Sequence, residues 1–306
     1  MKAKNNRTIT VDDSEKKVLM DMISTDLQME MPPFAIVNAD LFAVLDKVPD
    51  GFANLIIIDP PYNLRKDFAG STFSAMSSSS YEEYLRSWLP AVCRKLAHNG
   101  SLYMCGDWHC SSSMQRVLEE NLTVINRITW QREKGRGAKH NWKNAMEDIW
   151  FAVKNPDDYY FDVEAVKQKR RVLAPYRENG EPKDWQDTDD GKYRLTCPSN
   201  FWDDISVPFW SMPENTEHPT QKPEKLIAKL ILASSRPGDA IFDPFLGSGT
   251  TAAVAKKLGR KCLGIEQSLD YCLIAAKRLM LAEEMQSIQG YEDGVFWERN
   301  SALRLH

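Results

Sequence analysis

Short apolar runs alternate with stretches of helical periodicity along most of the chain. Residues 55–58 are four consecutive branched apolar residues, and such a run suits a parallel strand that is covered on both faces. Residues 81–96 instead place their apolar side chains at the three- and four-residue spacing of a helix. Because strands and helices of this kind follow one another in turn, the pattern predicts an α/β fold with a mostly parallel sheet.

The same patterns set the bounds of the expected elements. Strands are expected at 34–37, 54–59, 101–105, 123–130, 148–153, 159–163, 240–242 and 261–265. Helices are expected at 13–31, 81–96, 111–120, 223–234, 250–258 and 271–285, with a short one that ends at Leu45. We expect the first two strands to pair with each other, and we expect Asn99-Gly100 to end the helix at 81–96.

The alternation breaks between residues 131 and 217, where glycine, proline, asparagine and scattered aromatic residues replace it. An irregular stretch of this length inside a compact domain is usually a functional insertion. The predicted division of the chain is an extension (1–33), a first half of the α/β domain (34–130), an insertion (131–217), a second half (218–285) and a tail (286–306).

Composition narrows the class of protein. The formal net charge of −4 carries no overall signature of nucleic-acid binding, so any such function must rest on local basic clusters. The six cysteines form no C-x-x-C pair, which favours reduced core thiols over a metal site. No apolar run is long enough to span a membrane, and residues 1–13 are polar, so we expect no membrane segment and a cytoplasmic location.

The strand at 54–59 ends in the motif Asp59-Pro60-Pro61-Tyr62. Proline has no N–H to offer a neighbouring strand, so the two prolines stop the ladder. The acid and the aromatic ring are thereby presented at the carboxyl end of a buried strand, where open α/β sheets bind their ligands.

A second motif, Asp243-Pro244-Phe245-Leu246-Gly247-Ser248-Gly249-Thr250-Thr251, follows a strand and opens a helix. Its glycines permit a tight turn and a close approach of a ligand, and the helix N-terminus attracts anions. Glu266 stands nineteen residues after Gly247, at the end of the next strand, where a carboxylate can bind ribose hydroxyls. The loop alone fits a nicotinamide enzyme as well as other nucleoside-cofactor enzymes.

Together the two motifs resemble those of the exocyclic-amino DNA methyltransferases, which use S-adenosylmethionine. The segment His218-Pro219-Thr220-Gln221-Lys222-Pro223 also resembles the motif that leads into the cofactor half of that family. The catalytic tetrad comes first and the cofactor loop last, an order that resembles the beta class. The resemblance implies a doubly wound, methyltransferase-type (Rossmann-like) sheet with a target-recognition region inserted at 131–217.

The resemblance also implies a reaction. Asp59 and the carbonyl of Pro60 would accept the N–H bonds of an amino group on a flipped base, and Tyr62 would stack on that base; Pro61 completes the tetrad. An aspartate at the head of the tetrad favours adenine N6 over cytosine N4. The residues implied to bind the cofactor are Asp40, His218, Thr220, Lys222, Asp243, Phe245, Gly247, Ser248, Gly249, Thr250 and Glu266.

Within that set, the resemblance gives some residues particular contacts. Lys222, Ser248 and Thr250 would hold the methionine carboxylate of the cofactor. Glu266 would bind its ribose, and Asp40 its adenine amino group. Asp40 could also be no more than the cap of the short helix that follows it.

Double-stranded DNA is the implied partner, and two basic clusters are candidates to contact it. Residues 132–143 combine positive charge with glycines and Trp142, which suggests a loop that follows phosphates or fills the space left by a flipped base. The second cluster lies at 167–171. The predicted DNA-binding residues are Arg132, Lys134, Arg136, Lys139, Lys143, Lys169, Arg170 and Arg171.

Other expectations follow from the family alone. Beta-class relatives are often homodimers, and many act beside a cognate restriction endonuclease, while others are orphans. Cytosine N4 methylation and a non-catalytic DNA-binding regulator that retains the fold are the alternatives. A protein-glutamine methyltransferase fits less well, because its tetrad usually begins with asparagine and its cofactor loop precedes the tetrad.

Overall fold

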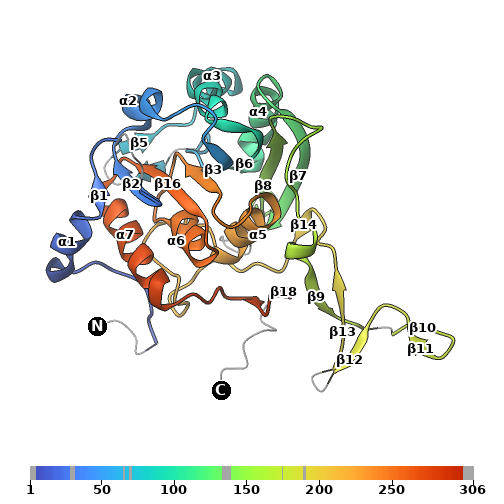
Figure 1. Cartoon of the computed structure of the whole chain (residues 1–306). Helices are drawn as coiled ribbons and strands as arrows, with labels where there is room; N and C mark the ends of the chain where they lie inside the picture. The colour runs from blue at the N-terminus through green and yellow to red at the C-terminus, as the bar shows by residue number, and fades with distance from the viewer. Residues whose placement is uncertain are drawn as a thin grey trace.

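The computed structural model describes residues 5–27, 32–64, 66–68, 71–132, 139–173, 175–188 and 191–298. Within these residues a nine-stranded sheet forms the centre of the molecule (Figure 1). In spatial order its strands are β1 (Ile23–Ser24), β2 (Phe34–Asn38), β16 (Lys261–Glu266), β15 (Ala240–Asp243), β3 (Ala53–Ile58), β6 (Leu96–Gly106), β8 (Met146–Val153), β7 (Thr123–Gln131) and β14 (Phe201–Trp202). Every neighbouring pair is parallel except β8 with β6 and β8 with β7. The predicted mostly parallel α/β fold is confirmed.

Helices cover both faces of this sheet and enclose a separate core on each (Figure 1). One face carries α2 (Leu41–Val44), α3 (Ser78–Arg94) and α4 (Trp108–Glu119); the other carries α5 (Glu224–Ser234), α6 (Thr250–Lys257) and α7 (Leu269–Glu284). Successive side chains of a strand point to opposite faces. Leu55 and Ile57 therefore join the core under α5–α7, while Ile56 and Ile58 join the core under α2–α4, which is why the run is apolar throughout.

The predicted pairing of the strands at 34–37 and 54–59 is wrong. β2 pairs with β1 and β16, and β15 lies between β16 and β3. Two strands from the second half of the chain, β16 and β15, thus lie between two strands of the first half. The order of the strands along the chain does not reveal this pairing. As a result, the carboxyl ends of β2, β16, β15 and β3 lie side by side.

The prediction of a helix over 13–31 is also wrong, because α1 (Asp13–Met20) ends at Met20 and β1 follows it. The extension is attached to the domain at several points, among them backbone hydrogen bonds from Arg7 to Trp210 and from Ile9 to Asn215. β1 adds an edge strand to the sheet, and Glu15 of α1 forms an ion pair with Lys277 of α7 at 2.6 Å.

Two further bounds differ from the prediction. Asn99 and Gly100 lie inside β6, since α3 already ends at Arg94; an added Cβ at Gly100 would lie 3.1 Å from the carbonyl oxygen of Ala53, so glycine permits the close pairing of β3 with β6. Residues 159–163 form no strand. The rings of Tyr159 and Phe161 in this segment pack on Phe151 of β8, with centroids 6.0 and 5.7 Å away, so their apolar character reflects packing rather than pairing.

The region 131–217 contributes to two sheets. β8 and β14 belong to the central sheet, whereas a five-stranded sheet combines β9 (Gln168–Arg171), β12 (Gln186–Thr188) and β13 (Gly191–Thr196) with β17 (Tyr291–Glu292) and β18 (Val295–Trp297) from the tail. We call residues 168–196 the arm. Its strands β12 and β13 and the hairpin of β10 (Arg177–Glu178) and β11 (Glu181–Pro182) extend away from the central sheet (Figure 1). A second hairpin joins β4 (Lys66–Phe68) to β5 (Ser71–Phe73).

Among the described residues, no helix has the length and apolar character needed to cross a membrane.

The packing of α6 on α7 yields a testable prediction. Gly249→Ala should lower the free energy of unfolding by about 3 kcal/mol, because φ is +77° and an added Cβ would lie 2.5 Å from the Cβ of Ala275. Gly259→Ala is the matched control: φ is +72° but nothing lies within 4 Å of an added Cβ, so only backbone strain of about 1–2 kcal/mol is expected. Urea unfolding measures both values, and equal losses would contradict the prediction.

Candidate active site

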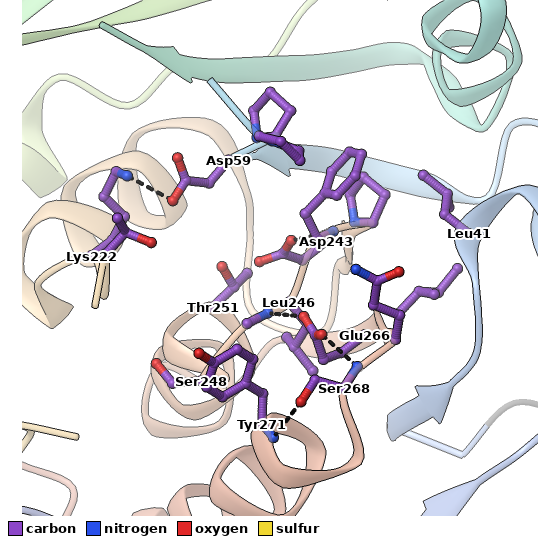
Figure 2. Close-up of a pocket in the computed structure, with 18 of the residues that line it drawn as sticks. Leu41, Asp59, Lys222, Asp243, Leu246, Ser248, Thr251, Glu266, Ser268 and Tyr271 are labelled. Carbon is purple, nitrogen blue, oxygen red and sulfur yellow. Dashed lines mark hydrogen bonds and ion pairs between the residues drawn. The ribbon is translucent and has the colours of Figure 1, made fainter. Parts of the chain in front are cut away.

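Acidic side chains follow four neighbouring strands of the sheet. Asp40, Glu266, Asp243 and Asp59 stand at the carboxyl ends of β2, β16, β15 and β3, in that spatial order. All four line one cavity of about 630 Å³. Figure 2 shows three of them, Asp59, Asp243 and Glu266. A cavity of this size at the carboxyl edge of an open α/β sheet is the ordinary place for a small-molecule site.

Asp59 is held by Lys222 and Tyr62. Lys222 precedes α5 and places its Nζ 2.6 Å from Asp59 Oδ2 (Figure 2) and 3.0 Å from the Tyr62 hydroxyl oxygen. The Tyr62 hydroxyl donates to Asp59 Oδ1 at 2.8 Å. Because each carboxylate oxygen has a partner, the orientation of the Asp59 side chain is fixed before any ligand binds.

A second acid, Glu147 of β8, contacts the same Lys222 and Tyr62 side chains. Its Oε2 lies 3.3 Å from Lys222 Nζ and 3.2 Å from the Tyr62 hydroxyl oxygen, and its Oε1 accepts a hydrogen bond from Arg132. The sequence analysis missed Glu147. No motif surrounds it, and the only signal is the pair of acids Glu147 and Asp148 at the start of β8, inside the region expected to be an insertion.

These contacts determine the charge state of two groups. Burial lowers the pKa of Lys222, but the carboxylates of Asp59 and Glu147 outweigh that effect and leave the pKa above its usual value. Burial, Asp59 and Glu147 all raise the pKa of the Tyr62 hydroxyl far above its usual value. At neutral pH, Lys222 is therefore a cation and Tyr62 a neutral hydrogen-bond donor, so neither can act as a base.

The loop between β15 and α6 is fixed by Glu266. Its Oε2 accepts the N–H of Gly247 at 2.9 Å, and its Oε1 accepts the N–H of Ser268 at 2.7 Å (Figure 2). Burial raises the pKa of this carboxyl. A carboxylate has about four acceptor positions, so Glu266 keeps the capacity to bind hydroxyl groups of a ligand.

Arg278 of α7 supports the same loop and was also missed by the sequence analysis. It is only 2% exposed, and its Nη1 donates to the carbonyl of Ser248 at 3.2 Å and to Thr250 Oγ1 at 2.7 Å. Its Nη2 binds Glu224 of α5 at 3.0 Å. An arginine in a helical pattern gives no sign in sequence that it is buried and ion-paired.

The structure brings the predicted motifs to one place. The tetrad Asp59-Pro60-Pro61-Tyr62 lines the cavity. So do ten of the predicted cofactor residues, namely Asp40, His218, Thr220, Lys222, Asp243, Phe245, Gly247, Ser248, Thr250 and Glu266. Gly249 is the cap of α6 and does not line the cavity. Asp40 lines the cavity, and it caps α2 by accepting the N–H of Phe42 at 2.9 Å, so its role as a helix cap is confirmed.

The first predicted DNA cluster is only partly described. Two of its members, Lys134 and Arg136, lie outside the described residues. Arg132 directs its guanidinium to Glu147 and is 29% exposed. Lys139 and Lys143 are exposed.

The second cluster lies on β9 in the arm. Lys169 Nζ lies over the ring of Trp297, 4.2 Å from its centroid, and Arg170 Nε lies 3.9 Å from a carboxylate oxygen of Glu298. Arg171 is exposed. Arg132, Lys139 and Lys143 therefore lie in the segment between β7 and β8, whereas the second cluster lies on β9 of the arm.

A family model described as DNA methylase matches residues 53–277, which is more than half of the chain. The chain belongs to this DNA methylase family. The match contains both the tetrad after β3 and the glycine loop after β15, so the two motifs belong to the region that defines the family.

Two relatives are similar over most of their length. DNA adenine methyltransferase YhdJ of Escherichia coli K12 is 34% identical over 277 residues, which cover 87% of this chain and 90% of the relative. The type II methyltransferase M.HpaI of Haemophilus parainfluenzae is 31% identical over 246 residues, which cover 80% of this chain and 73% of the relative.

Solved structures confirm the fold. The complex of M1.HpyAVI with S-adenosylmethionine aligns with a TM-score of 0.53 and 24% identity, covering 80% of this chain and all of the other. The cytosine-N4-specific PvuII DNA methyltransferase aligns with a TM-score of 0.60 and 17% identity, covering 84% of this chain and 94% of the other.

The crowding of acids predicts a dependence of stability on pH. Burial raises the pKa of Asp243 to about 7, to which the Asp59 and Glu266 carboxylates add, while bonds from Thr251 and the Phe245 N–H oppose the rise. Because this value exceeds the unfolded value of 3.8, the stabilisation from Asp243 is full below pH 3.8 and is lost as the pH rises through about 7.

Asp243→Asn should therefore gain stability relative to the wild type between pH 5 and pH 8, by roughly 2–4 kcal/mol. An asparagine can still accept the N–H of Phe245, which bonds Asp243 Oδ1 at 3.0 Å. Urea unfolding of the cofactor-free proteins at pH 5, 6, 7 and 8 measures the difference. Parallel pH profiles of the two proteins would contradict the prediction.

Proposed function

We propose that this DNA methylase transfers a methyl group from S-adenosylmethionine to the N6 amino group of adenine at a specific site in double-stranded DNA. The observation that carries the proposal is the position of Asp59 beside the glycine loop. β3 and β15 are parallel neighbours, so the tetrad and the loop border a single cavity.

The residues present fit the cofactor. The four strand ends from Asp40 to Asp59 span three strand spacings, about 14 Å, which suits a nucleoside joined to an amino acid. Gly247 has φ +53°, and an added Cβ would lie 3.1 Å from His218 Nε2, so glycine lets the loop pass close to the site. Glu266 would hold the ribose, Asp40 the adenine amino group, and Ser248 and Thr250 the carboxylate.

Asp59 and the carbonyl of Pro60 perform the central task. An adenine amino group is a poor nucleophile because its lone pair is delocalised into the ring. Acceptors on both N–H bonds draw the hydrogens aside and direct the lone pair away from the ring. The cofactor supplies a methyl group on a cationic sulfur, and the chain's own contribution is to position the amino group in line with it.

Lys222 was expected to hold the carboxylate of the cofactor, but its Nζ donates a hydrogen bond to Asp59 Oδ2. We therefore propose that Lys222 orients Asp59. Tyr62 offers its ring to the base, while its hydroxyl keeps Asp59 in place. Because a base in a duplex cannot reach this cavity, the proposed reaction includes flipping of the target nucleotide.

Adenine is favoured over cytosine by the aspartate of the tetrad and by the similarity to a relative named as an adenine methyltransferase. The fold is shared with a cytosine-N4-specific enzyme, so fold alone does not separate the two. Mass analysis of nucleosides from methylated DNA separates them, with N6-methyladenine as the expected product.

The biological role, the oligomeric state and the location of the protein are proposed from its family and relatives. Type II relatives support a role in restriction and modification beside a cognate endonuclease. We retain the homodimer, the cytoplasmic location and the recognition region at 131–217 as proposals, and we propose that the arm, which extends away from the central sheet (Figure 1), is part of that recognition region.

The tetrad yields the first functional prediction. Asp59→Ala should reduce methyl transfer by at least about 10²-fold, because an acceptor for the amino group is lost. Its dissociation constant for S-adenosylmethionine should stay within about threefold, since the glycine loop and Glu266 are intact. Single-turnover transfer of labelled methyl groups and calorimetry measure the two quantities.

Glu82→Gln is the control for Asp59→Ala, because it removes an acid from an ion pair of α3 with Arg116 of α4, outside the cavity. This control should methylate DNA at the wild-type rate. An unchanged rate in Asp59→Ala would disprove the assignment.

The basic cluster at residues 132–143 yields the second functional prediction. Lys139→Ala should weaken DNA binding and reduce the slope of log K against log salt by about 0.9, as expected for one lost phosphate contact. Lys16→Ala, which removes an exposed lysine ion-paired with Asp13 on α1, is the control. Fluorescence anisotropy with duplex DNA at several salt concentrations gives both slopes, and a Lys139→Ala slope equal to that of the wild type would remove this residue from the interface.

A further inference from the structure

Glu147 is the acid of the site that no sequence motif marks. It is 3% exposed and lies on β8, opposite Trp130 of β7 in the antiparallel ladder. β8 is separated from β3 by β6 in the sheet, so the side chain reaches the tetrad from two strands away. A carboxylate this deeply buried is costly unless each of its oxygens is well bonded.

The partners of Glu147 are the same groups that hold Asp59. Oε2 lies 3.3 Å from Lys222 Nζ and 3.2 Å from the Tyr62 hydroxyl oxygen. Those two atoms in turn contact Asp59 Oδ2 and Oδ1 at 2.6 and 2.8 Å. Glu147 thus contacts both of the groups that bond Asp59.

Arg132 balances the charge of this group. Its guanidinium donates to Glu147 Oε1, which leaves Oε2 for Lys222 and Tyr62. Two cations, Arg132 and Lys222, then face two carboxylates, Asp59 and Glu147, so the buried group is neutral as a whole. Without Glu147, Lys222 would keep one carboxylate, and the Tyr62 hydroxyl would lose one of the groups that fix its direction.

We propose that Glu147 is a positioning residue for methyl transfer. It fixes Lys222, which contacts both Asp59 Oδ2 and the Tyr62 hydroxyl oxygen, and so keeps both oxygens of Asp59 in place for the amino group of the target base. The inference rests on the proposed function, because it assigns Asp59 to that amino group. A misplacement of about 1 Å can cost about 10²-fold in rate. Glu147 does not line the main cavity, so its loss should leave cofactor binding intact.

The test compares Glu147→Gln with the wild type on duplex DNA. Glutamine keeps the length and one acceptor oxygen but removes the charge that balances Lys222 and Arg132. We expect kcat to fall by about 10- to 100-fold, while the KM for DNA and the dissociation constant for S-adenosylmethionine change by less than about threefold. Glu147→Asp keeps the charge with a shorter reach and should recover part of the lost kcat.

Asp204→Asn is the matched control. Asp204 is another buried carboxylate, 6% exposed, that is ion-paired with Lys225 and Lys229 and lies outside the cavity. Its loss should lower the thermal unfolding temperature, and we expect kcat to remain at the wild-type level. A purely structural role for Glu147 would give both variants the same pattern.

The possible outcomes distinguish a failure of this inference from a failure of the proposed function. If the wild-type protein produces no methylated adenine, the proposed function is wrong and the inference falls with it. If the wild type is active and Glu147→Gln has a wild-type kcat, only the inference is wrong. A parallel loss of kcat, cofactor binding and unfolding temperature would also overturn it. If Glu147→Gln does not fold, Glu147→Asp decides: a reduced kcat with unchanged cofactor binding supports the proposal, and a wild-type kcat overturns it.

Discussion

The parallel pairing of β3 with β15 is the constraint on which the site depends. Ile241 lies beside Leu55 and Phe242 beside Ile56, so the two strands end at the same edge. One end displays Asp59 and the prolines that stop the ladder, and the other opens into the glycine loop. Because these strands come from opposite ends of the chain, neither half of the sequence contains the site, and only the folded sheet assembles it.

The same pairing concentrates negative charge. Four acids at adjacent strand ends would repel one another in a buried cavity unless each had a partner. The structure supplies those partners: Lys222 at Asp59, and the backbone N–H groups of Gly247 and Ser268 at Glu266. Burial raises the pKa of Asp243 to about 7, and the carboxylates of Asp59 and Glu266 add to that rise. In the cavity, Asp59 and Glu266 are thus each held by hydrogen-bond donors.

Many of the residues that line the cavity could be predicted from sequence, because they belong to short motifs. Asp59 to Tyr62 and the loop at Gly247 each contain prolines or glycines, which are typical of the point where a strand ends. The neighbours of β2 could not be predicted, since apolar runs identify strands and not their partners. Glu147 and Arg278 were missed for a related reason. Their importance lies in burial and in contacts with residues far away in the chain, and nothing in the local pattern records either.

Single-molecule sequencing of DNA from cells that express the protein tests the central claim most directly, because it reads the modified base and its sequence context together. We predict N6-methyladenine at one short, defined sequence, absent from cells that express the Asp59→Ala variant. Modification of cytosine N4 at that sequence, or DNA with no added methyl group, would contradict the assignment.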